Sequence, residues 1–584
     1  MKEKCHLVNV YAPQDRQKKV QLWDELKTMI VEVGGRWLVA GDFNAVRSVE
    51  ERKGRTEDNS AMGDFNAFVE TTGLVDLRLV NRQYTWYRPD GSFMSRLDRF
   101  LLTSEMCSMG GEWVQKGLER TISDHCAITL TTRVADWGPK PFRVLDAWQQ
   151  HPEFKKVVEE AWRGMTVDGF AGYKCLRKMK LLKEFLRDWN KNVFGDMDAH
   201  FDSIAKKIEQ VDLQNEVCEL DDFEVEQRKE GFQELWLLLK KREAIWRQKS
   251  RSTWVQLGDA NAGFFHRMAN GRKAQNSIPG IFCDGMWVEE PEMVKKQVVS
   301  YFQQLFQGDS WNRPKPSGIQ FRRITEEQKE WLERPFTVEE IEEGLNSCEG
   351  HKAPGPDGYN FNFIKFVWDT LKDDFVEFFR EFHQRGRLVK GLNSSFLTLI
   401  PKKMNPLELK DFRPISLIGC IYKLLAKVLA NRLKNVMSNI ISDTQSAFLG
   451  GRQLVDSVLT LNEVVDEARR RKQQAFVFKA DFEKAYDCVD WSFLDWMMDR
   501  FGFGSRWRGW IKECLSTARV SILVNGSPTM EFQMGRGLRQ GDPLSPFLFL
   551  MIGEGLHGLV KKAEMEGLLH GIEIGKRGLL VLLL

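Results

Sequence analysis

The sequence predicts an α+β protein made of several domains. Its 584 residues would fill roughly three or four compact units of the usual size. Hydrophobic residues make up 42% of the chain and charged residues 29%, a balance that is typical of globular domains and too apolar for general disorder. The spacing of apolar residues changes along the chain, which indicates domains of different architecture.

The elements are expected in three successive regions. Residues 1–133 carry short apolar runs such as WLVAGDFN between Gly, Asp and Asn, with a helix expected over 20–33, which predicts alternating strands and helices. Over 154–267 the apolar residues recur three and four apart, which predicts long amphipathic helices. The stretch NRPKPSGIQ reads as a linker, and tight turns, a strand and several helices are expected after it.

Composition excludes several classes of protein. The ten cysteines are scattered without CxxC or Cys/His spacing, so neither a zinc module nor a disulfide framework is indicated, and a reducing intracellular compartment is expected. No run approaches the ~20 apolar residues of a membrane span. The net charge of +3 is small, but 85 Lys and Arg residues with 19 Trp and 39 Phe leave room for basic, aromatic grooves.

One predicted helix interleaves basic residues with Trp246 and Trp254, in FQELWLLLKKREAIWRQKSRSTWVQL. Such a helix either lies along a nucleic-acid backbone or packs its Trp side chains into a core while the charges face water. The pattern leaves both interpretations open.

The stretch FVFKADFEKAYDCVDW places an acidic residue, Asp481, at the end of an apolar run. Taken alone, such a residue is most often a turn or helix cap. Polymerisation of nucleotides, however, needs two divalent metals held by carboxylates on neighbouring strands. In that reading Phe482 offers a backbone carbonyl to the metal, and the ring of Tyr486 lies under the incoming sugar, where it would exclude a 2′-hydroxyl.

Neighbouring motifs favour the polymerase reading. GRGLRQGDPLSP combines a Gly-rich turn with Arg539, Gln540 and a helix start. KDFRPIS places Arg413 before a Pro-fixed extended segment, and LIPKK ends a predicted strand with two lysines, of which Lys402 is the first. Both basic groups are suited to holding a triphosphate.

Six motifs together resemble a known family: HKAPGPDG, LIPKK, FRPISL, QSAFLGGRQ, DFEKAYDCVDW and GLRQGDPLSP. They are similar to the fingers and palm motifs of the reverse transcriptase in LINE-type non-LTR retrotransposon polyproteins. The resemblance implies that Asp481 is the first metal-binding carboxylate and Tyr486 the sugar gate. It also implies that Arg413 and Lys402 hold the triphosphate, and that Gln540 contacts the nucleotide or the template.

The first third of the chain resembles the apurinic-type endonuclease of the same family. In NVYAP, Tyr11 matches the active-site tyrosine, and in GDFN, Asp42 and Asn44 match the pair that positions nucleophile and phosphate. Asp98 in RLDRFL matches the carboxylate that orients the catalytic histidine. SDHCAI supplies Asp124 and that histidine, His125.

The resemblance also implies a domain plan and a set of ligands. Residues 1–133 would form a partial four-layer α/β sandwich of the endonuclease/exonuclease/phosphatase type, 134–320 a mainly helical linker, and 321–584 the fingers and an incomplete palm of a right-hand polymerase. The implied cofactor is Mg²⁺ in a two-metal site. The implied partners are an RNA template, a DNA target or primer and dNTPs, without a membrane, and the family's chemistry implies nuclear action.

Two family motifs do not occur in these 584 residues. Family nucleases carry an Asn and a metal-binding Glu upstream of NVYAP, and family polymerases carry an aromatic-Ala-Asp-Asp hairpin after GLRQGDPLSP. A two-metal site with one carboxylate loses most of its catalytic power, so a truncated and catalytically defective enzyme is expected. The alternatives are a non-catalytic remnant that at most binds nucleic acid and, less favoured, a stand-alone repair nuclease.

Overall fold

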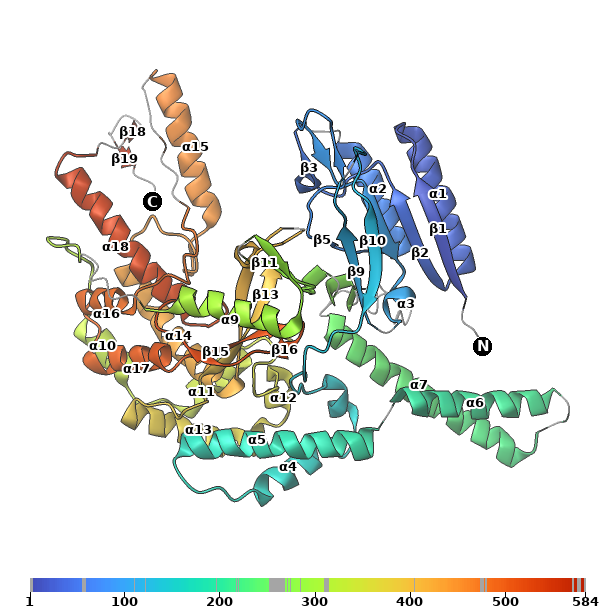
Figure 1. Cartoon of the computed structure of the whole chain (residues 1–584). Coiled ribbons are helices and arrows are strands. Elements are labelled where there is room, and N and C mark those ends of the chain that lie inside the picture. The colour runs from blue at the N-terminus through green and yellow to red at the C-terminus, as the bar shows by residue number, and fades with distance from the viewer. Residues whose placement is uncertain are drawn as a thin grey trace.

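The computed structural model describes residues 4–581, except 55–58, 110, 121, 196, 217, 219, 251–267, 270, 274, 284, 309–314, 404, 473–476, 478–480, 570–571 and 575–578. Figure 1 shows a strand-rich N-terminal body, a larger helical C-terminal body with a small sheet, and a helical hairpin that projects away from both. The α+β character predicted from the sequence is confirmed. Trp254 and the end of the basic helix lie outside the described residues.

The N-terminal body contains three small sheets. The first has the order β1-β2-β8-β4 and comprises β1 (Cys5–Tyr11), β2 (Arg36–Asp42), β8 (Asp98–Leu102) and β4 (Val75–Asp76). The second comprises β10 (Ile128–Arg133), β9 (Glu112–Gly117) and β5 (Leu79–Val80), and the third β3 (Arg52–Lys53), β7 (Met94–Ser95) and β6 (Trp86–Tyr87). The helical elements are α1 (Arg16–Val33), η1 (Val49–Glu51), α2 (Asn59–Thr72) and α3 (Ser104–Cys107).

Helix α1 begins four residues before the start expected at residue 20. Asp15 accounts for the difference, because its side chain accepts a 3.0 Å hydrogen bond from the backbone N–H of Lys18 and so caps the first turn. The helix buries Trp23, Leu26 and Ile30, which share one face. The ring of Trp23 packs against three phenylalanines in the core of this body: Phe43, Phe65 and Phe68.

The middle of the chain is helical, as the spacing predicts. Its elements are η2 (Asp146–Gln150), α4 (Phe154–Gly164), α5 (Ala171–Trp189), the π-helical η3 (Asn190–Phe194), α6 (Met197–Asn215), α7 (Asp222–Ser250), β11 (Ile281–Cys283), β12 (Met286–Val288) and α9 (Pro291–Phe306). Helices α6 and α7 form the projecting hairpin (Figure 1).

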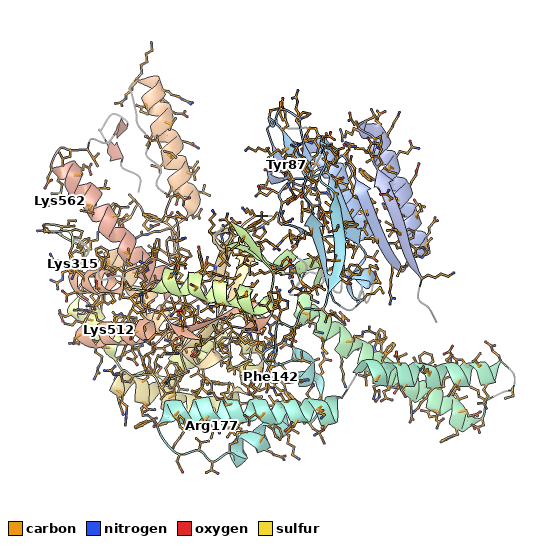
Figure 2. All side chains as sticks on the ribbon, viewed as in Figure 1. Tyr87, Phe142, Arg177, Lys315, Lys512 and Lys562 are labelled. Atoms are coloured by element: carbon orange, nitrogen blue, oxygen red, sulfur yellow. The ribbon has the colours of Figure 1, made fainter. Side chains whose placement is uncertain are left out.

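This middle region shares its cores with the C-terminal body. Helices α4 and α5 bury their apolar faces in one core with α13 and α14, and α9 lies in a second core with β13 and β15. Phe142, labelled in Figure 2, lies at the junction. Its ring centroid is 6.1 Å from that of Trp148 and 6.1 Å from that of Tyr359.

The C-terminal body surrounds a five-stranded sheet. Its path is β14 (Phe412–Ile418), β13 (Ser394–Pro401), β15 (Arg519–Val524) and β16 (Ser527–Pro528), and β17 (Phe532–Gln533) also pairs with β15. The helices are α10 (Glu326–Glu333), α11 (Val338–Asn346), α12 (Phe361–Phe366), α13 (Trp368–Arg385), η4 (Leu409–Asp411), α14 (Cys420–Ile440), α15 (Leu454–Arg470), α16 (Trp491–Arg500), α17 (Ser505–Ser516) and α18 (Ser545–Met565), followed by the β18 (Ile572–Ile574) and β19 (Leu579–Val581) pair. In the described part of the chain, no helix is both long and apolar enough to cross a membrane.

Candidate functional sites

The pairing register of the sheet places three predicted nuclease residues, Tyr11, Asp42 and Asp98, at the same level on adjacent strands. Together with His125 they are called the rung site. Strand β1 runs parallel to β2 with Tyr11 opposite Asp42, and β8 runs antiparallel to β2 with Asp98 opposite Asp42. Neighbouring strands lie about 4.8 Å apart. The ends of three adjacent strands therefore present Tyr11, Asp42 and Asp98 together, with the Tyr11 side chain exposed.

Asn44 fastens the turn that follows β2. It adopts a left-handed conformation with φ 46°, which Asn tolerates better than most residues. Its backbone N–H donates to Oδ1 of Asp42 at 2.8 Å, and its side-chain amide donates to the Ala12 carbonyl at 2.7 Å. Burial raises the pKa of Asp42, the Asn44 N–H opposes this shift, and the nearby carboxylate of Asp98 adds to it.

His125 completes the rung site. Its Nδ1 lies 2.9 Å from Oδ2 of Asp98, and because an ionised carboxylate only accepts, Nδ1 carries the proton of this hydrogen bond. A neutral imidazole held in this way keeps Nε2 as a base. The neighbouring Asp124 accepts a 3.0 Å hydrogen bond from the Trp86 indole, which lowers the pKa of this exposed carboxylate.

Thr85 connects the segment that carries Asp98 to the segment that carries His125, and it was not predicted from the sequence. Its fully buried hydroxyl accepts hydrogen bonds from the backbone N–H groups of Leu97 and Asp98, both at 3.0 Å. Its carbonyl accepts from the Cys126 N–H at 2.6 Å. A Thr in a short strand-like run carries no local signal of such long-range contacts.

A pocket of about 380 Å³ in the C-terminal body brings together the residues predicted to bind nucleotide and metal. The six predicted residues that line it are Lys402, Arg413, Asp481, Phe482, Tyr486 and Gln540. They come from four separate stretches of the chain. The strand expected before Asp481 falls largely on residues outside those described.

The sheet and its loops set the basic side of this pocket. Lys402 follows β13, and its backbone N–H donates to the Asp411 carbonyl at 2.8 Å. Arg413 lies near the start of β14 and is exposed. The Gln540 carbonyl accepts from the Ser416 N–H at 2.8 Å, and a Cβ on Gly541 would lie 2.9 Å from the Ser416 carbonyl oxygen, so only glycine fits there.

Arg539 supports the Gln540 loop from inside the protein. This buried guanidinium donates to Asp542 at 2.8 Å, and the hydroxyl of Tyr422 donates to the same carboxylate oxygen at 3.0 Å. Arg539 also lies over the Tyr422 ring, 4.5 Å from its centroid. These contacts hold the loop that presents Gln540.

The ring of Tyr486 is held by its neighbours. It stacks on Phe549 of α18 with ring centroids 5.1 Å apart and planes inclined by 23°, and Phe482 meets the same Phe549 ring edge-on at 6.4 Å. The Tyr486 carbonyl accepts from the Leu538 N–H at 2.7 Å, which joins this loop to the Gln540 loop. Burial raises the pKa of Tyr486.

Asp487 is a second carboxylate of this pocket that the sequence analysis did not single out. Burial raises its pKa to about 6, and the charges of Lys402 and Lys484 act in the opposite direction. Asp487 stands in the DFEKAYDC motif, and this position was the sequence feature that could have identified it as a residue of the pocket. Within the described residues, no group of three or more His, Cys, Asp or Glu side chains is arranged to hold a metal ion.

Comparison with known proteins identifies the two bodies. Residues 5–125 match the endonuclease/exonuclease/phosphatase family model, and residues 400–570 match the model of reverse transcriptase (RNA-dependent DNA polymerase). One chain therefore joins a region similar to the endonuclease/exonuclease/phosphatase family to a region similar to reverse transcriptases. These matches confirm the resemblance of the chain to the LINE-type polyproteins of non-LTR retrotransposons, which was found in its motifs.

Individual relatives agree with this assignment. The chain is 27% identical over 593 residues to the transposon TX1 uncharacterized 149 kDa protein of Xenopus laevis, covering 95% of this chain and 44% of that protein. It is 31% identical over 217 residues to a Pol polyprotein of retrotransposable element R2 from Popillia japonica, covering 37% of this chain and 29% of the relative. A Pol polyprotein of element R1 from Bradysia coprophila is 20% identical, with 90% of this chain and 54% of the relative covered. The chain thus spans about half or less of these relatives.

Proposed function

We propose that the pocket binds a deoxynucleoside triphosphate and that this region extends a DNA primer along an RNA template. The observation that carries the proposal is the convergence of Lys402, Arg413, Asp481, Tyr486 and Gln540 on one pocket. Reverse transcription requires a triphosphate, a sugar and a template base to be held together, and these side chains supply a group for each.

Each group has a chemical role in this proposal. Arg413 and Lys402 lie at the edge of the sheet and would hold the triphosphate through charge-assisted hydrogen bonds. The stacked ring of Tyr486 would leave no room for a 2′-hydroxyl. Gln540, fixed through its backbone to Ser416, would contact the nucleotide or the template base.

The pocket has two oxygen groups of the kind that Mg²⁺ prefers as ligands. Asp481 offers a carboxylate and Phe482 a backbone carbonyl, and Mg²⁺ in nucleotide enzymes is commonly held by one or two carboxylates together with substrate phosphates. When bound, Mg²⁺ would neutralise charge on the phosphates. The side chains of this pocket would bind and orient the nucleotide around it.

We further propose that the rung site hydrolyses a phosphodiester bond in target DNA. His125, with Nδ1 held by Asp98, would take a proton from the attacking water at Nε2, and the Asp98 carboxylate would stabilise the imidazolium that forms. Asp42 and Asn44 would orient the water and the phosphate. Together with the polymerase pocket, this predicts a DNA target, an RNA template and action on chromosomal DNA.

Nucleotide binding to the full chain tests the polymerase proposal without requiring turnover. Titration calorimetry with dGTP and Mg²⁺ should give an affinity that falls at least about tenfold in Arg413→Ala, because a charge-assisted contact to phosphate is lost. Tyr486→Ala should narrow the preference for dGTP over GTP. Arg380→Ala, at an exposed position on α13, is the matched control; an Arg413→Ala protein that binds like this control would refute the site.

A second function, nucleic-acid binding without catalysis, is favoured by the charge of α7. The second half of that helix carries five basic residues and one acidic residue: Lys240, Lys241, Arg242, Arg247, Lys249 and Glu243. Such a surface predicts RNA affinity that falls steeply as salt rises. Salt-dependent RNA binding by a chain that does not bind dGTP would point to this second function.

A further inference from the structure

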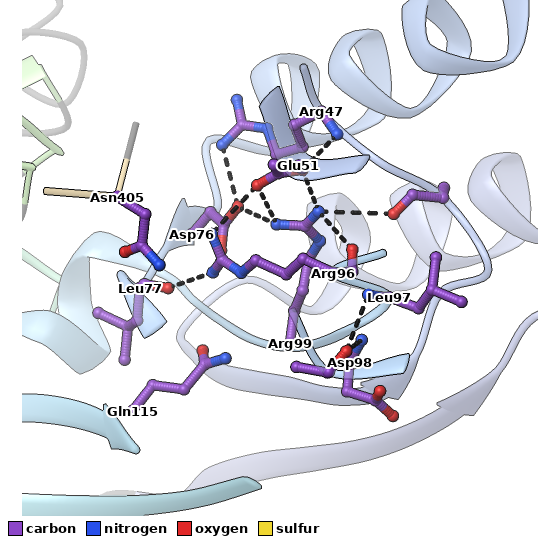
Figure 3. A network of polar contacts seen from close by, with 12 residues as sticks. Arg47, Glu51, Asp76, Leu77, Arg96, Leu97, Asp98, Arg99, Gln115 and Asn405 are labelled. Atoms are coloured by element: carbon purple, nitrogen blue, oxygen red, sulfur yellow. Dashed lines mark hydrogen bonds and ion pairs between the residues drawn. The ribbon is translucent and has the colours of Figure 1, made fainter. Parts of the chain in front are cut away.

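A buried cluster of charged side chains lies next to the nuclease rung (Figure 3). Two carboxylates, Glu51 and Asp76, face two guanidiniums, Arg96 and Arg99, and all four side chains are at most 5% exposed. Arg47 joins at the edge of the cluster, 3.5 Å from Asp76. None of these residues stands in a sequence motif that predicts a role for it.

Each guanidinium bridges both carboxylates. Arg96 donates to Glu51 at 3.1 Å and to Asp76 at 2.9 Å. Arg99 donates to Asp76 at 2.8 Å and to both oxygens of Glu51, one of them at 3.0 Å. Burial alone would raise the pKa of Glu51, but Arg99 and Arg96 outweigh that effect and hold the pKa at about 2.

The cluster joins three segments that are distant in the sequence. Glu51 ends η1, Asp76 ends β4, and the two arginines flank the start of β8. The side chain of Arg96 also donates to the Leu77 carbonyl at 2.6 Å, and Arg99 donates to the Arg96 carbonyl at 3.0 Å. The turn that leads into β8 is therefore fixed on one side by charge-assisted hydrogen bonds.

Asp98 lies between the two arginines and faces the other way. Successive side chains of a strand point to opposite faces of a sheet; Arg99 and Leu101 are buried on one face, whereas Asp98 meets His125 on the other. In Figure 3 the Asp98 carboxylate points away from the cluster.

Stability alone is a weak explanation for such a cluster. The desolvation of buried ion pairs offsets much of their attraction, and apolar residues of similar volume often stabilise a fold as well or better. A guanidinium fork that engages two carboxylates does, however, fix the direction of the backbone that carries it.

We propose that the Glu51–Asp76–Arg96–Arg99 cluster is a positioning device that aims Asp98 at Nδ1 of His125. The proposal rests on the nuclease role proposed above for the Asp98–His125 pair. The four residues are not proposed to touch substrate. They act through the backbone of β8, and removing them leaves His125 without a fixed partner for its Nδ1 proton.

The test replaces a charge pair without unbalancing the cluster. In the double variant Glu51→Leu/Arg99→Met one positive and one negative charge are lost, and Arg96 keeps Asp76 as its partner. The readout is the ¹⁵N spectrum of the His125 ring in the full chain, assigned with His125→Gln. Nδ1–H should dominate in the parent protein, and the Nε2–H tautomer should gain population in the variant.

The matched control is Arg16→Met/Asp64→Leu, which removes a partly exposed ion pair of 2.7 Å from the same body. It should leave the His125 tautomer unchanged. A Glu51→Leu/Arg99→Met protein that melts like this control and keeps the parent tautomer would overturn the proposal. If that variant does not fold, Glu51→Gln replaces it, with a smaller shift in the same direction expected and an unchanged tautomer again decisive against the proposal.

The readout is independent of catalysis. A parent chain that holds the Nδ1–H tautomer but does not nick DNA would count against the proposed nuclease function, not against the positioning of Asp98. A tautomer that shifts in the double variant and not in the control supports the positioning role whichever result the nicking assay gives.

Discussion

At the scale of a single residue, Asp487 shows how burial in a pocket makes the ionised form of a carboxylate unfavourable. Burial raises its pKa to about 6, whereas an Asp in an unfolded chain titrates near 3.9. The folded protein therefore binds this proton more tightly than the unfolded chain. Between pH 4 and pH 6 the contribution of Asp487 to stability falls as the pH rises, and above about pH 6 it remains unfavourable.

Asp487→Asn should consequently stabilise the C-terminal body at neutral pH. A pKa of about 6 in place of about 3.9 corresponds to on the order of 2–3 kcal/mol, and the gain should be present at pH 7.5 and almost absent at pH 4. Denaturant melts of parent and variant at the two pH values check this. A gain of equal size at both pH values would show that its origin is not the titration of Asp487.

The residue scale also separates what sequence patterns can and cannot reveal. Lys402, Arg413 and Tyr486, which line one pocket, could be predicted as site residues because each stands in a local motif. Thr85 and Glu51 were not, because their partners lie far away in the sequence: Thr85 bonds residues 97, 98 and 126, and Glu51 stands in the charged run EERK that reads as a solvated surface.

At the scale of the element, α14 organises the C-terminal body. Most of its side chains are buried, and among them is Arg432, whose guanidinium donates to Glu340 of α11 at 2.6 and 2.8 Å. The same group donates to the carbonyls of Leu332, Arg334 and Pro335. Arg432 thus supplies hydrogen-bond donors to the carbonyls at the end of α10 and binds Glu340 near the start of α11.

Arg432→Met should destabilise this body by about 3–5 kcal/mol, because a largely buried carboxylate and several carbonyls lose their partner. Chemical unfolding followed by circular dichroism measures the change. Arg380→Met, at an exposed position on α13, should cost little. Near-equal midpoints for the two variants would contradict the role assigned to Arg432.

Element boundaries followed from the sequence where a local signal existed. The 3.6-residue spacing predicted the helices of the middle region, and the LIPKK motif predicted the end of β13. Helices α4, α5 and α9 pack into the cores of the C-terminal body. This packing could not be predicted from the sequence, because periodicity identifies the apolar face of a helix but not the surface that covers it.

At the scale of the whole molecule, the two bodies meet at a polar contact. Arg78, next to the charged cluster, donates to the carbonyls of Ser277 and Gln275, the first at 3.0 Å. Burial lowers the pKa of Arg78 to about 10. Asn405 lies in the loop that follows Lys402, and its side-chain amide donates a hydrogen bond to the Arg82 carbonyl at 3.0 Å.

Arg78→Ala should loosen this contact without unfolding either body. Hydrogen exchange in the full chain should become faster at residues 77–82 and 275–278 and stay unchanged in the interior of α14. Lys116→Ala, which removes a partly exposed 3.8 Å pair with Glu289, is the control and should have little effect. Unchanged exchange in Arg78→Ala would show that the bodies are held by other contacts.

Protection of Lys402 by nucleotide tests the central claim, that the pocket is a nucleotide site, most directly. The full chain is treated with a lysine-reactive reagent with and without saturating dGTP and Mg²⁺, and the modification of each lysine is measured by mass spectrometry. We predict that dGTP protects Lys402 several-fold and leaves Lys434, an exposed lysine of α14, unchanged. Equal modification of Lys402 with and without dGTP would contradict the account.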